Sequence, residues 1–71
     1  MSRPRAHTVI VNQTSREVVD DHNSHQPIFA GAPQGAKVGE DVRVTSRDGV
    51  GFQGFVAATT EAGDMLVRIR G

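Results

Sequence analysis

The stretch of sequence that decides the fold is residues 42–56, which read VRVTSRDGVGFQGFV. Apolar and polar residues alternate on both sides of the turn signal Arg47-Asp48-Gly49, as they do in two antiparallel strands joined as a hairpin. A further alternation follows in residues 65–70, MLVRIR. These segments together predict a three-strand antiparallel meander.

The hydrophobic pattern also selects the register of the first hairpin. A two-residue turn would place Val44 opposite Gln53 and mix apolar and polar side chains on one face. A three-residue loop, with Gly49 in the left-handed conformation, places Val44 opposite Phe52 instead. Because a one-residue slip turns every side chain to the other face, we predict the three-residue loop. The predicted pairs are Ser46 with Val50, Val44 with Phe52, and Val42 with Gly54.

The last strand joins the same buried face through a second loop. A four-residue loop over residues 60–63 pairs Ala58 with Met65 and Val56 with Val67. Turn chemistry and hydrophobic pattern then agree on one buried surface for all three strands. The predicted inner face consists of Val42, Val44, Val50, Phe52, Val56, Met65, Val67 and Ile69.

The opposite face of the meander gathers arginine and apolar side chains. The candidate interaction residues on it are Arg43, Arg47, Phe55, Leu66, Arg68 and Arg70. The acidic residues of this half fall in turns and at strand ends, which leaves the face basic. Arginine and aromatic residues are enriched at protein interfaces, and they also bind single-stranded nucleic acid. Since the chain has eight Lys and Arg and eight Asp and Glu, protein contact is the leading interpretation, with RNA or single-stranded DNA as the alternative.

The first half of the chain has a different character. We expect residues 1–37 to form an extended arm and loop with one or two short strands, and residues 38–71 to form the meander. The β-branched run at residues 8–11 predicts a strand. Residues 16–19 are interpreted as a second short strand, with a single helical turn as the alternative. Two isolated apolar residues complete the candidate interaction set, as anchors of the arm: Ile28 and Phe29.

The size of the chain sets a limit on its core. Seventy-one residues with three aromatic residues and no cysteine build a small core without disulfides. Three strands leave open edges, so residues 8–11 are expected to cover one edge, within the chain or on a neighbouring copy. The expected fold is mainly β: a small SH3-like or Sm-like open barrel, or a three-strand meander completed by an N-terminal strand. Self-association or docking on a larger complex is expected to complete the core.

No residue pattern in the sequence is typical of an active site. His22 and His25 lie in the polar stretch 20–27, which we interpret as a solvated loop and not as a metal site. A nucleophile elbow or a phosphate-binding loop is not apparent, so we expect no catalytic, cofactor-binding or metal-binding residues and no enzyme activity. An apolar run of membrane-spanning length and a secretory signal are also not apparent. A non-catalytic structural or adaptor protein of the cytoplasm or of a viral particle is the leading hypothesis.

Part of residues 42–56 resembles a known signature. Val42-Arg43-Val44, Asp48-Gly49 and Phe52-Gln53-Gly54-Phe55-Val56 resemble the first signature of the Sm-like RNA-binding proteins. More loosely, the chain is similar to SH3-like small barrels, including the plasmid-borne dihydrofolate reductase type. The resemblance implies a small barrel and carries no family function, because Thr60 and Asp64 stand where Sm-like proteins have Asp and Asn. A counterpart of the Val-Gln-Ile-Tyr run of the reductases is also missing.

Overall fold

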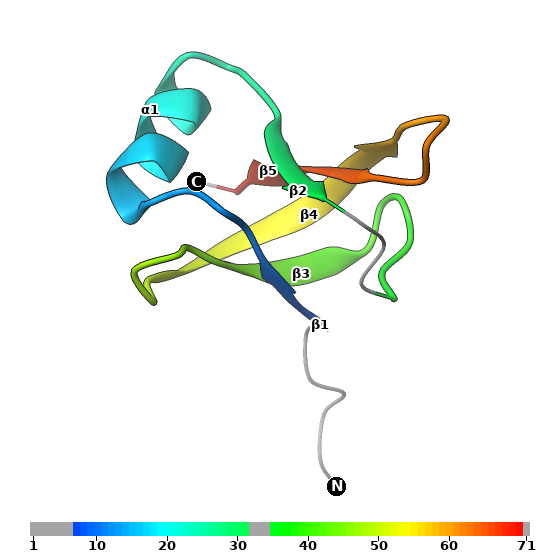
Figure 1. The fold of residues 1–71 in the computed structure, drawn as a ribbon, viewed down its shortest axis with the longest axis horizontal. Helices are drawn as coiled ribbons and strands as arrows, with labels where there is room; N and C mark the ends of the chain where they lie inside the picture. Colours follow the sequence, from blue (N-terminus) through cyan, green and yellow to red (C-terminus); the bar gives the residue numbers. More distant parts are fainter. Residues whose placement is uncertain (1–6, 32–34, 71) are drawn as a thin grey trace, which may run out of the picture.

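A computed structural model describes residues 7–31 and 35–70 of this chain. Along these residues the elements are β1 (His7–Ile10), α1 (Ser15–Asn23), β2 (Ile28–Gly31), β3 (Asp41–Thr45), β4 (Gly51–Thr59) and β5 (Met65–Ile69). The strands form one sheet in the order β1-β3-β4-β5-β2, and the sheet curls into an open half-barrel with α1 beside it (Figure 1). The prediction of a mainly β, open-barrel fold is therefore confirmed.

The first hairpin has the predicted register. β3 and β4 are antiparallel, and Val44 is paired with Phe52. The Ser46 N–H donates to the Val50 carbonyl over 2.8 Å, so three residues form the loop. Gly49 has a φ of 90°, and a β-carbon there would meet no atom within 4 Å. Position 49 therefore requires glycine because of its backbone conformation, and not because space for a side chain is lacking.

The second hairpin follows the prediction only in part. Val56 pairs with Val67 as expected, whereas the predicted pairing of Ala58 with Met65 is wrong. A register shift between Val56 and Ala58 moves Thr59 opposite Met65. A β-bulge adds one residue to one strand only, and simple alternation does not reveal it.

The two hairpin loops share one hydrogen-bond pattern. The Thr60 N–H donates to the Asp64 carbonyl over 2.9 Å, and the Gly63 N–H donates to the Thr60 carbonyl over 2.9 Å. Gly63 has a φ of 89°. The second loop therefore has three residues between its hydrogen-bonded pair, as the first has, and not the four that we predicted.

The expected N-terminal strand is present and pairs within its own chain. β1 runs parallel to β3, with Val9 opposite Val44. The Val11 N–H extends this pairing by donating to the Thr45 carbonyl over 3.0 Å. The sequence left open whether this strand pairs within its own chain or with a neighbouring copy, and it pairs within its own chain. At the other end of the sheet, β2 pairs with β5, so both halves of the chain build the same sheet.

The short strand preferred for residues 16–19 is wrong, because this segment lies in α1. Thr14 caps the helix: its side chain accepts from the Glu17 N–H over 3.3 Å, and its own N–H donates to the Glu17 carboxylate over 3.0 Å. The Thr14 N–H and, over 3.1 Å, the Thr14 hydroxyl donate to the Glu17 carboxylate, and these two hydrogen bonds lower the pKa of Glu17. Val18 is buried while Val19 is 42% exposed. The helix extends to Asn23, into the stretch that we expected to be a loop.

The core lies inside the curl of the sheet and under α1. Its buried apolar residues are Val9, Val11, Val18, Ile28, Ala30, Val42, Val44, Val56, Met65 and Val67. Phe52 and Ile69 pack against this core, as predicted. Val50 does not, because it directly follows the first loop and is 42% exposed. All residues of the predicted inner face except Val50 thus contribute to the core.

Candidate functional site

The register defines which side chains share the outer surface of the sheet, since directly opposed residues of paired strands lie on the same side. Thr8 is opposite Arg43, Arg43 is opposite Gln53, and Phe55 is opposite both Asp41 and Arg68. Phe29 is opposite Leu66. We use the name outer face for these residues together with Arg70: Thr8, Phe29, Asp41, Arg43, Gln53, Phe55, Leu66, Arg68 and Arg70.

The structure brings most of the predicted interaction residues together on this face. Those that lie on it are Phe29, Arg43, Phe55, Leu66, Arg68 and Arg70. Arg47 lies instead in the loop between β3 and β4, beside the start of α1. Ile28 is 1% exposed and belongs to the core of the chain itself, so Phe29 is the exposed member of the predicted anchor pair.

Arg70, Phe55 and Asp41 form a stacked and paired group on the outer face. The Cζ of Arg70 lies 4.8 Å from the centroid of the Phe55 ring. Its Nη2 and Nε lie 2.7 and 2.9 Å from Oδ1 of Asp41. A guanidinium over an aromatic face is a favourable cation–π arrangement. Asp41 stands at a strand end, as expected, because it is the first residue of β3. It lies directly opposite Phe55, however, and so neutralises one arginine of this face.

Arg43 lies free on the same face. It is exposed, and its side chain forms no ion pair or hydrogen bond with the residues 7–31 and 35–70. It extends over Gly51, since a β-carbon on that glycine would approach Nε of Arg43 to 2.7 Å. A larger residue at Gly51 would therefore displace the guanidinium. Among the described residues, no side chain neutralises the positive charge of Arg43.

Arg68 lies deeper than the other arginines of the described chain, which are all exposed. Its Nη1 donates to the His25 carbonyl over 3.2 Å. This bond ties the end of β5 to the segment between α1 and β2. Arg68 also lines a recess of about 170 Å³ together with His22 and His25.

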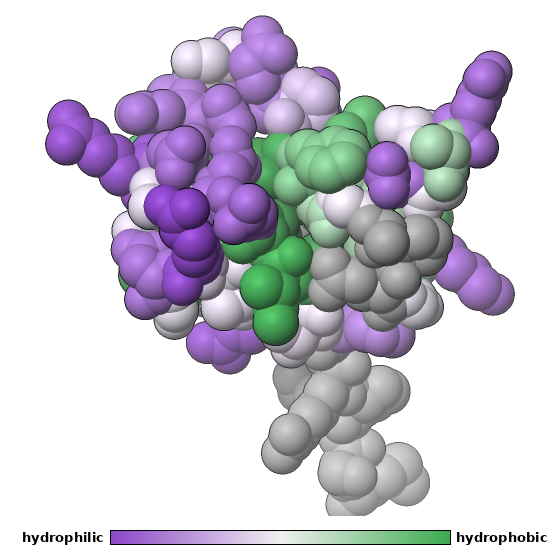
Figure 2. All heavy atoms as spheres, in the orientation of Figure 1, coloured by the Kyte–Doolittle hydropathy of each residue, from purple (hydrophilic) through white to green (hydrophobic). Residues whose placement is uncertain are grey.

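An apolar area lies at the β2 end of the outer face. Phe29 is 56% exposed and is paired with the partly buried Leu66. Figure 2 shows polar surface over α1 and apolar surface beside it, over β1 and β2, which are the two edge strands of the sheet. An exposed aromatic side chain beside further apolar surface is a candidate contact site.

Asp48 connects the first hairpin loop with α1. Its carboxylate accepts from the Ser15 N–H and from the Ser15 hydroxyl, each over 2.7 Å. It also accepts from the Ser46 hydroxyl. The hydrogen bonds from Ser46 and then from Ser15 lower the pKa of Asp48 to about 2. The neighbouring Arg47 adds a backbone hydrogen bond to the Gln13 carbonyl over 2.7 Å, so this loop has a structural role.

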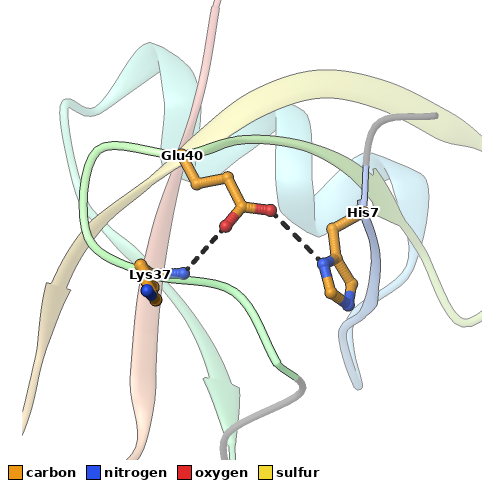
Figure 3. A network of polar contacts seen from close by, with 3 residues as sticks. All are labelled: His7, Lys37 and Glu40. Atoms are coloured by element: carbon orange, nitrogen blue, oxygen red, sulfur yellow. Dashed lines mark hydrogen bonds and ion pairs between the residues drawn. The ribbon is translucent and has the colours of Figure 1, made fainter. Parts of the chain in front are cut away.

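A second polar group fixes the start of β1 (Figure 3). The His7 Nδ1 lies 3.3 Å from one Glu40 carboxylate oxygen, and the Lys37 N–H donates to the other over 3.2 Å. Both side chains of the His7–Glu40 pair are more than a third exposed, so solvent screens it and its contribution to stability is small. The contact positions β1 against the turn that precedes β3.

Neither a cluster of metal-ligating side chains nor a membrane-spanning helix is found in the described part of the chain. Residues 7–31 and 35–70 contain no group of three or more His, Asp or Glu placed to bind a metal ion. The described helix α1 is too short to cross a bilayer. Comparison with known proteins finds no matching family model, no significantly similar curated protein and no significantly similar solved structure.

Sequence reasoning missed two parts of this surface. Asp41 neutralises Arg70 because the register of β3 and β4 places Asp41 opposite Phe55. The predicted pair of Val42 with Gly54 already implied this position, but the sequence pattern did not indicate its effect on the charge of the face. The closeness of His22 and His25 to Arg68 had no local signal, because it depends on β2 pairing with β5.

Proposed function

We propose that this protein is a non-catalytic structural or adaptor protein that binds protein through its outer face. The partner is a second copy of the chain or a subunit of a larger assembly, such as a viral particle or a cytoplasmic complex. The observation that carries the proposal is Phe29, an aromatic side chain 56% exposed on the terminal strand of the sheet beside Leu66. An exposed aromatic residue on a surface that also carries arginine side chains has the composition of a protein contact site.

The same surface is less suited to nucleic acid. Stacking of bases needs a free aromatic face, and the guanidinium of Arg70 covers the ring of Phe55. The charge of Arg70 is neutralised by Asp41, 2.7 Å away. Phe29 is exposed, but β4 and β5 separate it from the free Arg43. The charges and the aromatic ring are therefore not arranged along one path for a phosphate backbone.

The self-assembling form of the proposal is tested by measuring native mass against protein concentration. We expect wild-type protein to form a defined oligomer by sedimentation velocity. Phe29→Ser should weaken the oligomer about tenfold, because it removes the exposed aromatic ring of the proposed contact. Val38→Ser is the matched control, since Val38 is 57% exposed but lies before β3 and outside the outer face. A monomer at every concentration contradicts self-assembly and leaves only docking on another protein.

Docking on another protein is tested by placing a photo-crosslinking amino acid at position 29 or at position 38 in cells that carry the native complex. We expect one discrete adduct from position 29 and none from position 38. Equal adducts from both positions would contradict a specific contact at Phe29.

The nucleic-acid alternative is separated by titrating single-stranded oligonucleotides across salt concentrations. Phosphate contacts make affinity fall steeply as salt rises, and Arg43→Gln should reduce such binding. Under the proposal we expect only weak binding that is the same for wild type and Arg43→Gln. Tight, salt-dependent binding that requires Arg43 would replace the proposed function.

A further inference from the structure

A recess of about 170 Å³ lies where α1 ends, beside the beginning of β2 and the end of β5. Its lining residues are His22, His25, Gln26, Phe55, Arg68 and Ile69. Two histidines and an arginine share this lining with the apolar side chains of Phe55 and Ile69, and no carboxylate belongs to it. The recess therefore has the composition of a site for a negatively charged group.

Arg68 lines this recess without an ion-pair partner among the described residues. A guanidinium has five N–H donors, and the Arg68 side chain uses one of its nitrogens for the His25 carbonyl, at 3.2 Å. It forms no ion pair with the residues that the structure describes. It is also partly buried, unlike Arg70, which is exposed and paired with Asp41. Withdrawing an unpaired cation from water is costly, and a bound anion would offset this cost.

The backbone that frames the recess is held in place. The N–H groups of Ser24, His25 and Gln26 donate to the carbonyls of Asp20, His22 and Asp21 over 3.0, 3.2 and 2.9 Å. His25 has a φ of 57°, in the left-handed region. These bonds occupy carbonyls of the last helical turn, which otherwise present partial negative charge to an anion. They also fix His25 against Arg68.

We propose that Arg68, His22 and His25 form a binding site for an oxyanion, a phosphate or a carboxylate group. The free guanidinium nitrogens of Arg68 supply forked donors that match two oxygens of such a group. The imidazoles supply further N–H donors, and positive charge when they are protonated. The site shares Arg68 and Phe55 with the outer face, but anion binding needs no protein partner and does not involve Phe29, so its test can fail while the proposed function stands.

The carboxylates around the recess do not compete with an anion for Arg68 and the two histidines. Asp21 precedes His22, but its carboxylate accepts from Nε2 of Gln13 over 2.8 Å. Asp20 is exposed, and neither aspartate lines the recess. On the side of β5, Arg70 stacks on Phe55 and is held by Asp41. Arg68 and the two histidines are thus the charged or titratable groups that line the recess.

The test is a titration of the full chain with inorganic phosphate at about pH 6, followed by NMR of the imidazole signals. We expect saturable shifts of His22 and His25, with His7, which lies in β1, as the internal reference. Arg68→Gln should weaken binding at least about tenfold, because it removes the charge and the forked donors. Arg43→Gln is the matched control and should change affinity less than about twofold. Equal shifts of His7, or unchanged affinity in Arg68→Gln, would overturn the site.

Two further variants keep the test decisive if Arg68→Gln disturbs β5. Arg68→Lys keeps the positive charge and should retain part of the affinity. Replacing His22 and His25 together by Gln leaves β5 unchanged and should also weaken phosphate binding, because it removes the imidazole groups that line the recess. Acetate in place of phosphate identifies the group: tighter phosphate binding assigns a phosphate, tighter acetate binding a carboxylate, and binding of neither contradicts the proposal.

Discussion

Asp48 shows how one side chain connects parts of the chain that are far apart in sequence. It lies in the loop between β3 and β4, yet it accepts two hydrogen bonds from Ser15 at the start of α1. We predicted Asp48 as a turn residue, which it is. Its second role was not visible in the sequence, because that role requires the fold to bring α1 against this loop.

The lowered pKa of Asp48 makes part of the stability depend on pH. The folded carboxyl titrates at about 2 rather than at its ordinary 3.8, so the unfolded state binds the proton more readily. The contribution is complete above pH 3.8 and is lost as the pH falls from 3.8 toward 2. We expect Asp48→Asn to lower the melting temperature by several degrees at pH 7 and to have little effect near pH 2.

Thermal unfolding of wild type and Asp48→Asn between pH 2 and pH 7 checks this prediction. Asp64→Asn is the control, because Asp64 follows the second loop and its side chain makes no hydrogen bond or ion pair with the described residues. A constant difference between wild type and Asp48→Asn at every pH would show that the charge of Asp48 is not responsible.

At the scale of elements, the sequence predicted the strands better than the helix. The turn signal and the valine alternation were enough to find β3, β4 and their register. The helix was missed because Val18 and Val19 are adjacent β-branched residues, which favour a strand. The signal that identifies it was present as Thr14 followed three residues later by Glu17, a capping box.

The cap of α1 should therefore be essential to the helix. Nine residues are too few for a helix that is stable alone, and α1 buries only Val18 within its described span. We expect Thr14→Ala to cost about 1 kcal/mol of unfolding free energy. Thr14→Ser keeps the side-chain acceptor and should cost much less. Denaturant titration of both variants measures the loss of unfolding free energy. Amide exchange in α1, which should be faster in Thr14→Ala, is the second readout. Equal losses of unfolding free energy in the two variants would contradict a capping role.

At the scale of the whole molecule, the N-terminal segment is part of the domain. Val9, Val11 and Val18 are at most 1% exposed, so they complete a core that the meander alone leaves open. We expect deletion of residues 1–20 to abolish cooperative unfolding. The sequence correctly indicated that an additional strand must cover an edge. It did not indicate that β2 covers the other edge, because Ile28 and Phe29 are too short a run to predict a strand.

Two substitutions at neighbouring positions of β1 test whether the N-terminal segment packs in the core, without removing that segment. Val9→Ala should destabilise by about 2 kcal/mol, because it leaves a cavity in the core. Ile10→Ala should change stability by less than about 0.5 kcal/mol, since Ile10 is 62% exposed. Equal effects in equilibrium denaturation would show that β1 does not pack as described.

The parallel pairing of β1 with β3 also has a consequence for the order of folding. His7 pairs with Val42 across a connection that contains α1 and β2, whereas short loops join β3, β4 and β5. Closing a long loop costs entropy before its contacts can repay it, so β1 should dock after the rate-limiting barrier. Val9→Ala would then accelerate unfolding and leave the folding rate nearly unchanged in stopped-flow experiments. In the transition state the chain would contain the meander of β3, β4 and β5, and β1 would join the sheet afterwards.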